Sequence, residues 1–144
     1  MKRFAVALGL ALAAAASGAT AENESTFEAI KIQAGKALYD AECHRCHATD
    51  AEDASYGPPL QNIIGRGAGT VEDYDYSIAL EASGIVWTQA ALRAWMEDNK
   101  GFMPGTKMRH VGIQDSTAQD FVLAYLASIS DGTSGEISET LDGN

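Results

Sequence analysis

Two cysteines and a histidine form the chemically distinctive part of this sequence. Cys43 and Cys46 are separated by two residues, and His47 follows directly. This C-x-x-C-H spacing is the attachment signature of c-type haem. The two thiols form thioethers with the vinyl groups of the porphyrin, and the adjacent imidazole is placed to bind the iron. The motif therefore predicts one covalently attached haem c.

Three other interpretations of the motif fit the chain less well. A redox-active C-x-x-C centre needs a βαβ setting, whereas the apolar pattern of this chain is helical. A disulfide is the ordinary state of two cysteines in an exported chain, but the histidine directly after Cys46 favours haem. A zinc site needs four ligands, and outside the motif the chain offers only His110 and no further cysteine.

The ligand on the other side of the iron decides what the haem can do. A methionine thioether raises the reduction potential and closes the iron to small molecules, whereas a second histidine lowers the potential. The candidates after the motif are Met96, Met103, Met108 and His110. Met96 falls on the apolar face of a predicted helix, which favours a core role. Met103 and Met108 flank a Pro-Gly pair in an irregular segment, and spacing alone does not choose between them.

The elements that must position these groups are predicted to be helical. Apolar residues recur at helical spacing, and no convincing alternating strand pattern is present. The fold prediction is therefore all-α, with long loops that need a buried cofactor to fold around. The predicted helices cover residues 27–42, 77–82, 89–99 and 116–128.

Local signals refine this pattern at three positions. Thr88 is a good N-cap for the third helix, and Ser116 with Gln119 forms a capping box at the start of the fourth. Gly35 lies inside the first helix, where glycine costs about 1 kcal/mol relative to alanine. That cost indicates a packing requirement at Gly35.

The N-terminus has the pattern of a cleaved secretory signal peptide, assigned to residues 1–21. Lys2 and Arg3 precede an apolar run, and Ala19-Thr20-Ala21 has the form of a cleavage site. The run is too short to span a bilayer comfortably, and no later stretch is long and apolar enough to do so. We therefore expect export to the periplasm without stable membrane insertion.

The mature chain is expected to be a single domain followed by an acidic tail. Residues 22–129 form the predicted domain, and residues 130–144 carry four acids and no base, which predicts disorder. The mature chain would hold 8 basic and 20 acidic residues, a formal charge of −12. This charge argues against nucleic acid and anionic membranes as partners, and favours a partner with a basic or weakly charged docking face.

From Gly35 to about Ile129 the sequence resembles the class I cytochromes c, the mitochondrial and bacterial short-chain type. Beyond the haem motif, the strongest similarity is Pro104-Gly105-Thr106-Lys107-Met108. In that family the phrase ends in the axial methionine. The resemblance therefore implies that His47 and Met108 ligate the iron, and that Met103 is a packing residue.

The resemblance also implies roles for residues around the haem. Arg66, Tyr76 and Trp87 fall at the family's spacings and would hydrogen-bond or screen the inner propionate, since a buried carboxylate needs donors and positive charge. Pro58 resembles the proline of the loop whose backbone carbonyl accepts the imidazole N–H of the proximal histidine, here His47.

The first and last helices would cross where Gly35 allows a close approach. By resemblance Tyr39 belongs to the contacts of the first helix, and Val122 and Tyr125 to those of the last. We interpret both tyrosines as ordinary core residues.

Several positions depart from the family pattern. Trp95 stands where a tyrosine usually hydrogen-bonds the axial methionine, and Leu80 stands where an asparagine usually holds a buried water. His110 replaces an aromatic residue at the haem edge, so a bis-histidine state is conceivable at high pH or on methionine loss. The methionine side of the haem is therefore expected to have an altered polar network.

The charge around the predicted haem edge also departs from the family. Glu42 and Asp115 occupy positions where lysines usually steer docking, and Lys100 and Lys107 remain. The resemblance implies a monomeric electron carrier between periplasmic redox enzymes, not an enzyme. The departures in charge predict that its docking face is acidic rather than lysine-rich. Alternatives are a dedicated electron acceptor or subunit of one periplasmic dehydrogenase and, less favoured, a haem sensor or peroxidase-like enzyme with open iron.

Overall fold

Five helices form the framework of the described part of the chain. The computed structural model describes residues 14–48 and 55–130, and over these ranges it contains no β-strand, only an isolated bridge between Gly67 and Val86. The predicted all-α class is therefore confirmed. The helices are α1 (Ala14–Glu42), α2 (Ile78–Glu81), α3 (Gln89–Glu97), α4 (Asn99–Phe102) and α5 (Ser116–Ser128).

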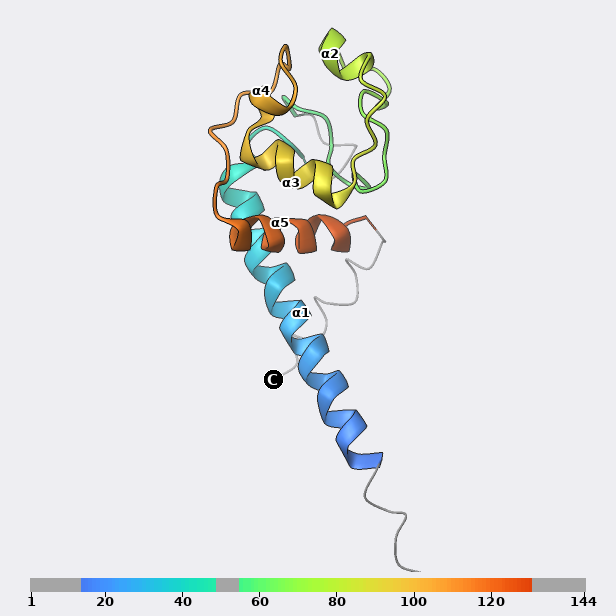
Figure 1. Cartoon of the computed structure of the whole chain (residues 1–144), viewed down its shortest axis with the longest axis vertical. Helices are drawn as coiled ribbons and strands as arrows, with labels where there is room; N and C mark the ends of the chain where they lie inside the picture. Colours follow the sequence, from blue (N-terminus) through green and yellow to red (C-terminus); the bar gives the residue numbers. More distant parts are fainter. Residues whose placement is uncertain (1–13, 49–54, 131–144) are drawn as a thin grey trace, which may run out of the picture.

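The first and last helices cross at a glycine, as predicted. α5 lies across the C-terminal half of α1 (Figure 1). Gly35 is buried there, and a Cβ atom added to it would lie 1.8 Å from the carbonyl oxygen of Phe121. Only a residue without a side chain lets two helix backbones approach this closely. Tyr39, Val122 and Tyr125 are buried around this point.

Side-chain caps fix where the two middle helices begin. The Ser77 hydroxyl accepts a hydrogen bond from the Leu80 N–H at 3.3 Å, which starts α2. The Thr88 hydroxyl accepts from the Ala91 N–H at 3.1 Å, which confirms the predicted N-cap of α3. Each cap satisfies one of the backbone donors that the first turn of a helix leaves unpaired.

The capping box predicted at Ser116 is wrong by one residue. The N-cap of α5 is Asp115, whose carboxylate accepts from the Ala118 N–H at 2.9 Å. A carboxylate is favoured over a hydroxyl here because it also faces the positive end of the helix dipole. Gln119 does not fold back to close a box, and instead donates from its amide to the carbonyl of Ile113 at 2.6 Å.

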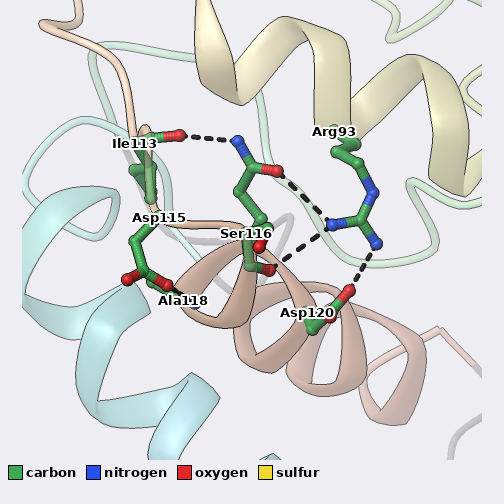
Figure 2. A network of polar contacts seen from close by, with 7 residues as sticks. Arg93, Ile113, Asp115, Ser116, Ala118 and Asp120 are labelled. Carbon is green, nitrogen blue, oxygen red and sulfur yellow. Dashed lines mark hydrogen bonds and ion pairs between the residues drawn. The ribbon is translucent and has the colours of Figure 1, made fainter.

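The polar network at this helix start also connects α5 to α3. Arg93 of α3 donates to the Gln119 side chain at 3.4 Å and forms an ion pair with Asp120, as Figure 2 shows. The same guanidinium lies 3.5 Å from the Ser116 carbonyl oxygen. One arginine therefore fixes the beginning of α5 against the helix that forms one wall of the site.

Two helix boundaries differ from the prediction. α1 begins at Ala14 rather than at Phe27. The added stretch, residues 14–26, contains five alanines and no proline, so nothing in it breaks the helix. The third predicted helix divides at Asp98, whose extended backbone ends α3 and whose carboxylate caps α4 by accepting from the Gly101 N–H at 2.9 Å.

Some predictions fall on parts of the chain outside the described residues. These parts are residues 1–13, with most of the apolar run of the predicted signal peptide, residues 49–54 of a predicted loop, and residues 131–144 of the predicted acidic tail. Within the described ranges, no helix combines the length and apolar character needed to cross a membrane.

Candidate functional site

One cavity brings together all eight residues that were predicted to bind haem or to ligate its iron. It has a volume of about 400 Å³, within the range of small-molecule and cofactor sites. Its walls are largely apolar, with both aliphatic residues such as Leu80 and Leu92 and aromatic residues such as Trp87 among them. The eight predicted site residues that line it are Cys43, Cys46, His47, Pro58, Arg66, Tyr76, Trp87 and Met108.

The thiols are presented by a tight turn directly after α1. The N–H groups of Cys46 and His47 donate to the Cys43 carbonyl at 3.0 and 2.9 Å. Both cysteines are free thiols; Cys43 is partly buried and Cys46 is exposed. Burial, with a smaller effect of the Glu42 carboxylate, raises the pKa of the Cys43 thiol to about 11. The turn therefore offers two unpaired thiols at one edge of the cavity, as two-point attachment of a ring requires.

The imidazole of His47 is held in one orientation. Its Nδ1 lies 2.8 Å from the carbonyl oxygen of Pro58, so Nδ1 must carry the proton and Nε2 keeps its lone pair. Burial lowers the pKa of His47, which keeps the ring neutral, as a metal ligand must be. Gly57 packs against the ring, and a Cβ atom there would lie 2.5 Å from Cε1 of His47.

The thioether of Met108 also lines the cavity and could donate its sulfur lone pair to a metal. Trp95 of α3 holds this sulfur in place. The indole N–H of Trp95 donates to the Met108 sulfur at 2.9 Å. The Met108 N–H donates to the Thr106 hydroxyl at 3.2 Å, and Gly105 turns the chain with a φ of +93°. The hydrogen bond to the Met108 sulfur therefore comes from the indole of Trp95 rather than from the tyrosine hydroxyl that usually stands at this position in the family.

The other candidates for the sixth ligand are less suitably placed. Met103 is buried in the core and does not line the cavity, and Met96 lines it from the apolar face of α3. His110 also lines the cavity, but its Nδ1 accepts a hydrogen bond from the Gly112 N–H at 3.0 Å. Its Nε2 therefore carries the proton and lies 3.6 Å from the Glu42 carboxylate, beyond hydrogen-bond range. Neither nitrogen of His110 is free to bind a metal in this arrangement.

Polar groups line a further part of the cavity. Arg66 donates to the carbonyls of Pro59 and Gln61 at 2.8 and 3.0 Å, which holds its guanidinium beside Tyr76. Burial lowers the pKa of Arg66, although a guanidinium stays charged at any physiological pH. Tyr76 and Trp87 are buried nearly completely. A cation and two aromatic donors suit an otherwise buried carboxylate such as a haem propionate.

Two contacts at the site were not anticipated from the sequence. The hydroxyl of Tyr39, interpreted as a plain core residue, donates to the His47 carbonyl at 2.7 Å. The ammonium of Lys107 donates to the Asp75 carbonyl at 2.9 Å and pairs with the Asp75 carboxylate at 2.7 Å, and both residues line the cavity. The hydroxyl of Tyr39 on an otherwise apolar helix face is the sequence feature that could have indicated this hydrogen bond.

An all-α chain with two adjacent thiols, a neutral imidazole and a thioether on one apolar cavity defines the class of proteins that bind haem covalently. The comparisons place the chain within that class. The family model described as cytochrome c matches residues 32–130. The chain belongs to the cytochrome c family, as a class I c-type cytochrome. Members of this family carry covalent haem c and transfer electrons.

Individual relatives agree with this assignment. Cytochrome c-550 of Nitrobacter winogradskyi is 39% identical over 97 residues, which are 67% of this chain and 88% of that protein. Cytochrome c 2.1 of Caenorhabditis briggsae is 36% identical over 92 residues, 64% of this chain and 82% of that protein. Among solved structures, cytochrome cH from Methylobacterium extorquens matches with a TM-score of 0.62 and 38% identity, covering 67% of this chain and 96% of that one.

Proposed function

We propose that this protein is a periplasmic electron carrier with one haem, whose iron is ligated by Nε2 of His47 and the sulfur of Met108. One observation carries the proposal. The two donors line the same apolar cavity as the paired thiols, and each donor is fixed by its own hydrogen bond, from His47 to Pro58 and from Trp95 to Met108. When bound, haem supplies a centre that gains and loses one electron.

The chain's own contribution would be to keep this centre unchanged between its two oxidation states. Two protein ligands leave no open position for small molecules, which argues against a gas sensor or a peroxidase-like enzyme. The apolar walls would keep water away from the bound group, so that little solvent would reorganise when its charge changes. Arg66 would offset the charge of a buried propionate, with Tyr76 and Trp87 as donors.

The spectrum of the purified wild-type protein tests this proposal directly. We expect the oxidised protein to show the weak far-red absorption band that marks methionine–iron ligation. The reduced protein should not bind carbon monoxide readily, because both axial positions are filled. Absence of the band together with ready carbon monoxide binding would overturn the carrier assignment in favour of an open haem.

Replacing Trp95 should lower the reduction potential while Met108 remains the iron ligand. The indole N–H withdraws electron density from the sulfur, which disfavours the ferric state, so Trp95→Phe should stabilise that state. One hydrogen bond contributes about 0.5–1.5 kcal/mol, or about 20–60 mV for one electron. Redox titration measures this shift.

Two further variants separate the hydrogen bond from packing. Trp95→Tyr keeps a donor and should recover most of the lost potential. The ring centroid of Phe102 lies 6.0 Å from that of Trp95. Phe102→Leu therefore removes aromatic packing beside Trp95 but removes no hydrogen-bond donor. A potential that falls equally in Phe102→Leu and Trp95→Phe would contradict the hydrogen-bond explanation.

We also propose that residues 1–21 are a signal peptide removed on export, so that the mature protein is residues 22–144 with its domain at 22–129. The basic start and the small residues before Glu22 support this cut. Export also agrees with the motif, because haem is attached to such motifs outside the cytoplasm.

The proposed docking face is the mouth of the cavity, and it lacks a ring of free lysines. Lys107 is neutralised by Asp75, and the carboxylate of Glu42 lies at the rim near His110. Asp115 is occupied as the cap of α5. Arg109 is also exposed at this rim, so the face carries both signs of charge under a strongly acidic whole. A partner with a uniformly acidic docking face would gain little electrostatic attraction from this mixed surface.

Electron transfer to an oxidase with an acidic docking face should therefore be slow at low salt and should not slow further as salt is added. Stopped-flow mixing across ionic strength measures this dependence. Glu42→Lys should raise the rate at low salt on the order of a few-fold, because it adds positive charge at the mouth. Glu24→Lys, the same change in the N-terminal half of α1 and outside the cavity lining, is the matched control. Fast wild-type transfer that falls steeply with salt would exclude this docking model.

A further inference from the structure

Tyr39 connects the helix crossing to the attachment motif at two points. Its side chain is completely buried, and its ring packs on that of Tyr125 of α5 with centroids 5.1 Å apart. Its hydroxyl donates to the His47 carbonyl at 2.7 Å. Its own carbonyl accepts the N–H groups of Cys43 and His44 at 2.8 and 2.9 Å. One core residue therefore holds both ends of the C-x-x-C-H turn.

His47 is consequently fixed by two different parts of the chain. The loop after the motif holds its ring, through the Pro58 carbonyl and the packing of Gly57. The helix α1 holds its backbone, through the Tyr39 hydroxyl. An imidazole constrained at Nδ1 alone could still turn about that hydrogen bond as its backbone moved. Constraints on both the ring and the backbone define the plane of the imidazole.

The hydroxyl is suited to a permanent constraint. A phenol keeps its proton at neutral pH, so the buried hydroxyl of Tyr39 remains a donor to the His47 carbonyl. The crossing at Gly35 leaves the ring no room to move away, because Tyr39 and Val122 are the most completely buried large side chains in the described part of the chain. The acceptor is a backbone carbonyl that would otherwise lack this partner in a partly buried site.

We propose that Tyr39 is a positioning residue for the proximal histidine: its hydroxyl fixes the His47 backbone and thereby sets the orientation of the imidazole plane at the iron. The inference rests on the proposed ligation by His47. It gives the α1–α5 crossing a second role, since movement at the crossing would be transmitted to the ligand through a single hydrogen bond.

The test compares two isosteric variants of the haem-loaded protein. Tyr39→Phe removes the hydroxyl that reaches His47. Tyr125→Phe removes a hydroxyl from the same helix crossing, but that hydroxyl lies near Lys36 and Asp40 rather than near His47. Proton NMR of the oxidised protein gives the hyperfine shifts of the four haem methyl groups, whose spread depends on the orientation of the imidazole plane. We expect Tyr39→Phe to change this spread and Tyr125→Phe to keep the wild-type value.

Loss of stability alone would not support the proposal, because either variant could lower it. A wild-type methyl pattern in Tyr39→Phe, with or without lower stability, would overturn the proposal and leave Tyr39 a packing residue. The wild-type protein offers a second measurement. In its reduced form the Tyr39 hydroxyl proton should exchange slowly and show a nuclear Overhauser effect to His47, and rapid exchange would also overturn the proposal. Absence of hyperfine-shifted His47 ring protons in the oxidised wild type would instead overturn the proposed ligation, and the inference with it.

Discussion

Met108→Ala should abolish the far-red absorption band of the oxidised protein and lower its reduction potential. A thioether ligand favours the ferrous state, and alanine leaves no donor at that position. The expected fall is about 0.2 V, a fraction of the roughly 0.8 V that axial ligands can span. The vacated position should also admit carbon monoxide in the reduced protein. Redox titration and absorption spectra measure all three effects.

Met103→Ala is the matched control for this change. Met103 lies five residues earlier in the same segment, is 7% exposed, and belongs to the core rather than to the cavity. Its truncation should cost about 2–5 kcal/mol of unfolding free energy while the band and the potential stay near their wild-type values. A Met108→Ala variant that keeps the wild-type spectrum and potential would show that another residue ligates the iron.

Gly35→Ala should destabilise the protein by about 3 kcal/mol, although alanine is the better helix former. The added methyl group would sit 1.8 Å from the Phe121 oxygen and 2.6 Å from the Phe121 carbonyl carbon. These are backbone atoms of α5, so the contact is relieved only by separating the two helices. The gain in helix propensity, about 1 kcal/mol, is too small to offset this loss. Denaturant unfolding of the haem-loaded protein measures the change.

Ala37→Gly is the control for helix propensity. Ala37 lies two residues further along α1 and is exposed, so this change alters the backbone preference without a tertiary contact. It should cost about 1 kcal/mol. If Gly35→Ala were as stable as the wild type, the close approach of α1 and α5 would not exist in solution.

The packing of Tyr39 on Tyr125 gives the Gly35 variant a further expected consequence. A shift of α5 away from α1 would loosen the contact between the two tilted rings and with it the hydrogen bond from Tyr39 to His47. Gly35→Ala should therefore change the spread of the haem methyl shifts in the same direction as Tyr39→Phe does.

Several features of the fold could be predicted because they depend on neighbouring residues. The all-α class follows from helical spacing, and the start of α3 from the hydroxyl of Thr88. The cap of α5 was misplaced because Asp115 and Ser116 are both good caps, and only the path of the preceding segment decides between them. The extent of α1 was underestimated because a stretch that contains five alanines and no proline can continue a helix that is already formed.

The chemistry of haem attachment follows from residue order alone. Cys43, Cys46 and His47 lie within one turn, so their relative placement depends on local backbone geometry and on nothing distant. Spacing narrowed the second ligand to a few candidates, and only the resemblance selected Met108.

How the thiols, the imidazole and the thioether are held depends on contacts between separate segments of the chain. The bond from Trp95 to Met108 joins residues 13 apart, and the bond from Tyr39 to His47 joins residues 8 apart across a helix end. Each of these two hydrogen bonds depends on how separate segments of the chain pack against one another. The close approach of α1 and α5 at Gly35 sets part of this packing. Local sequence therefore placed the thiols and the imidazole, while packing fixed their orientation and the partner of the sulfur.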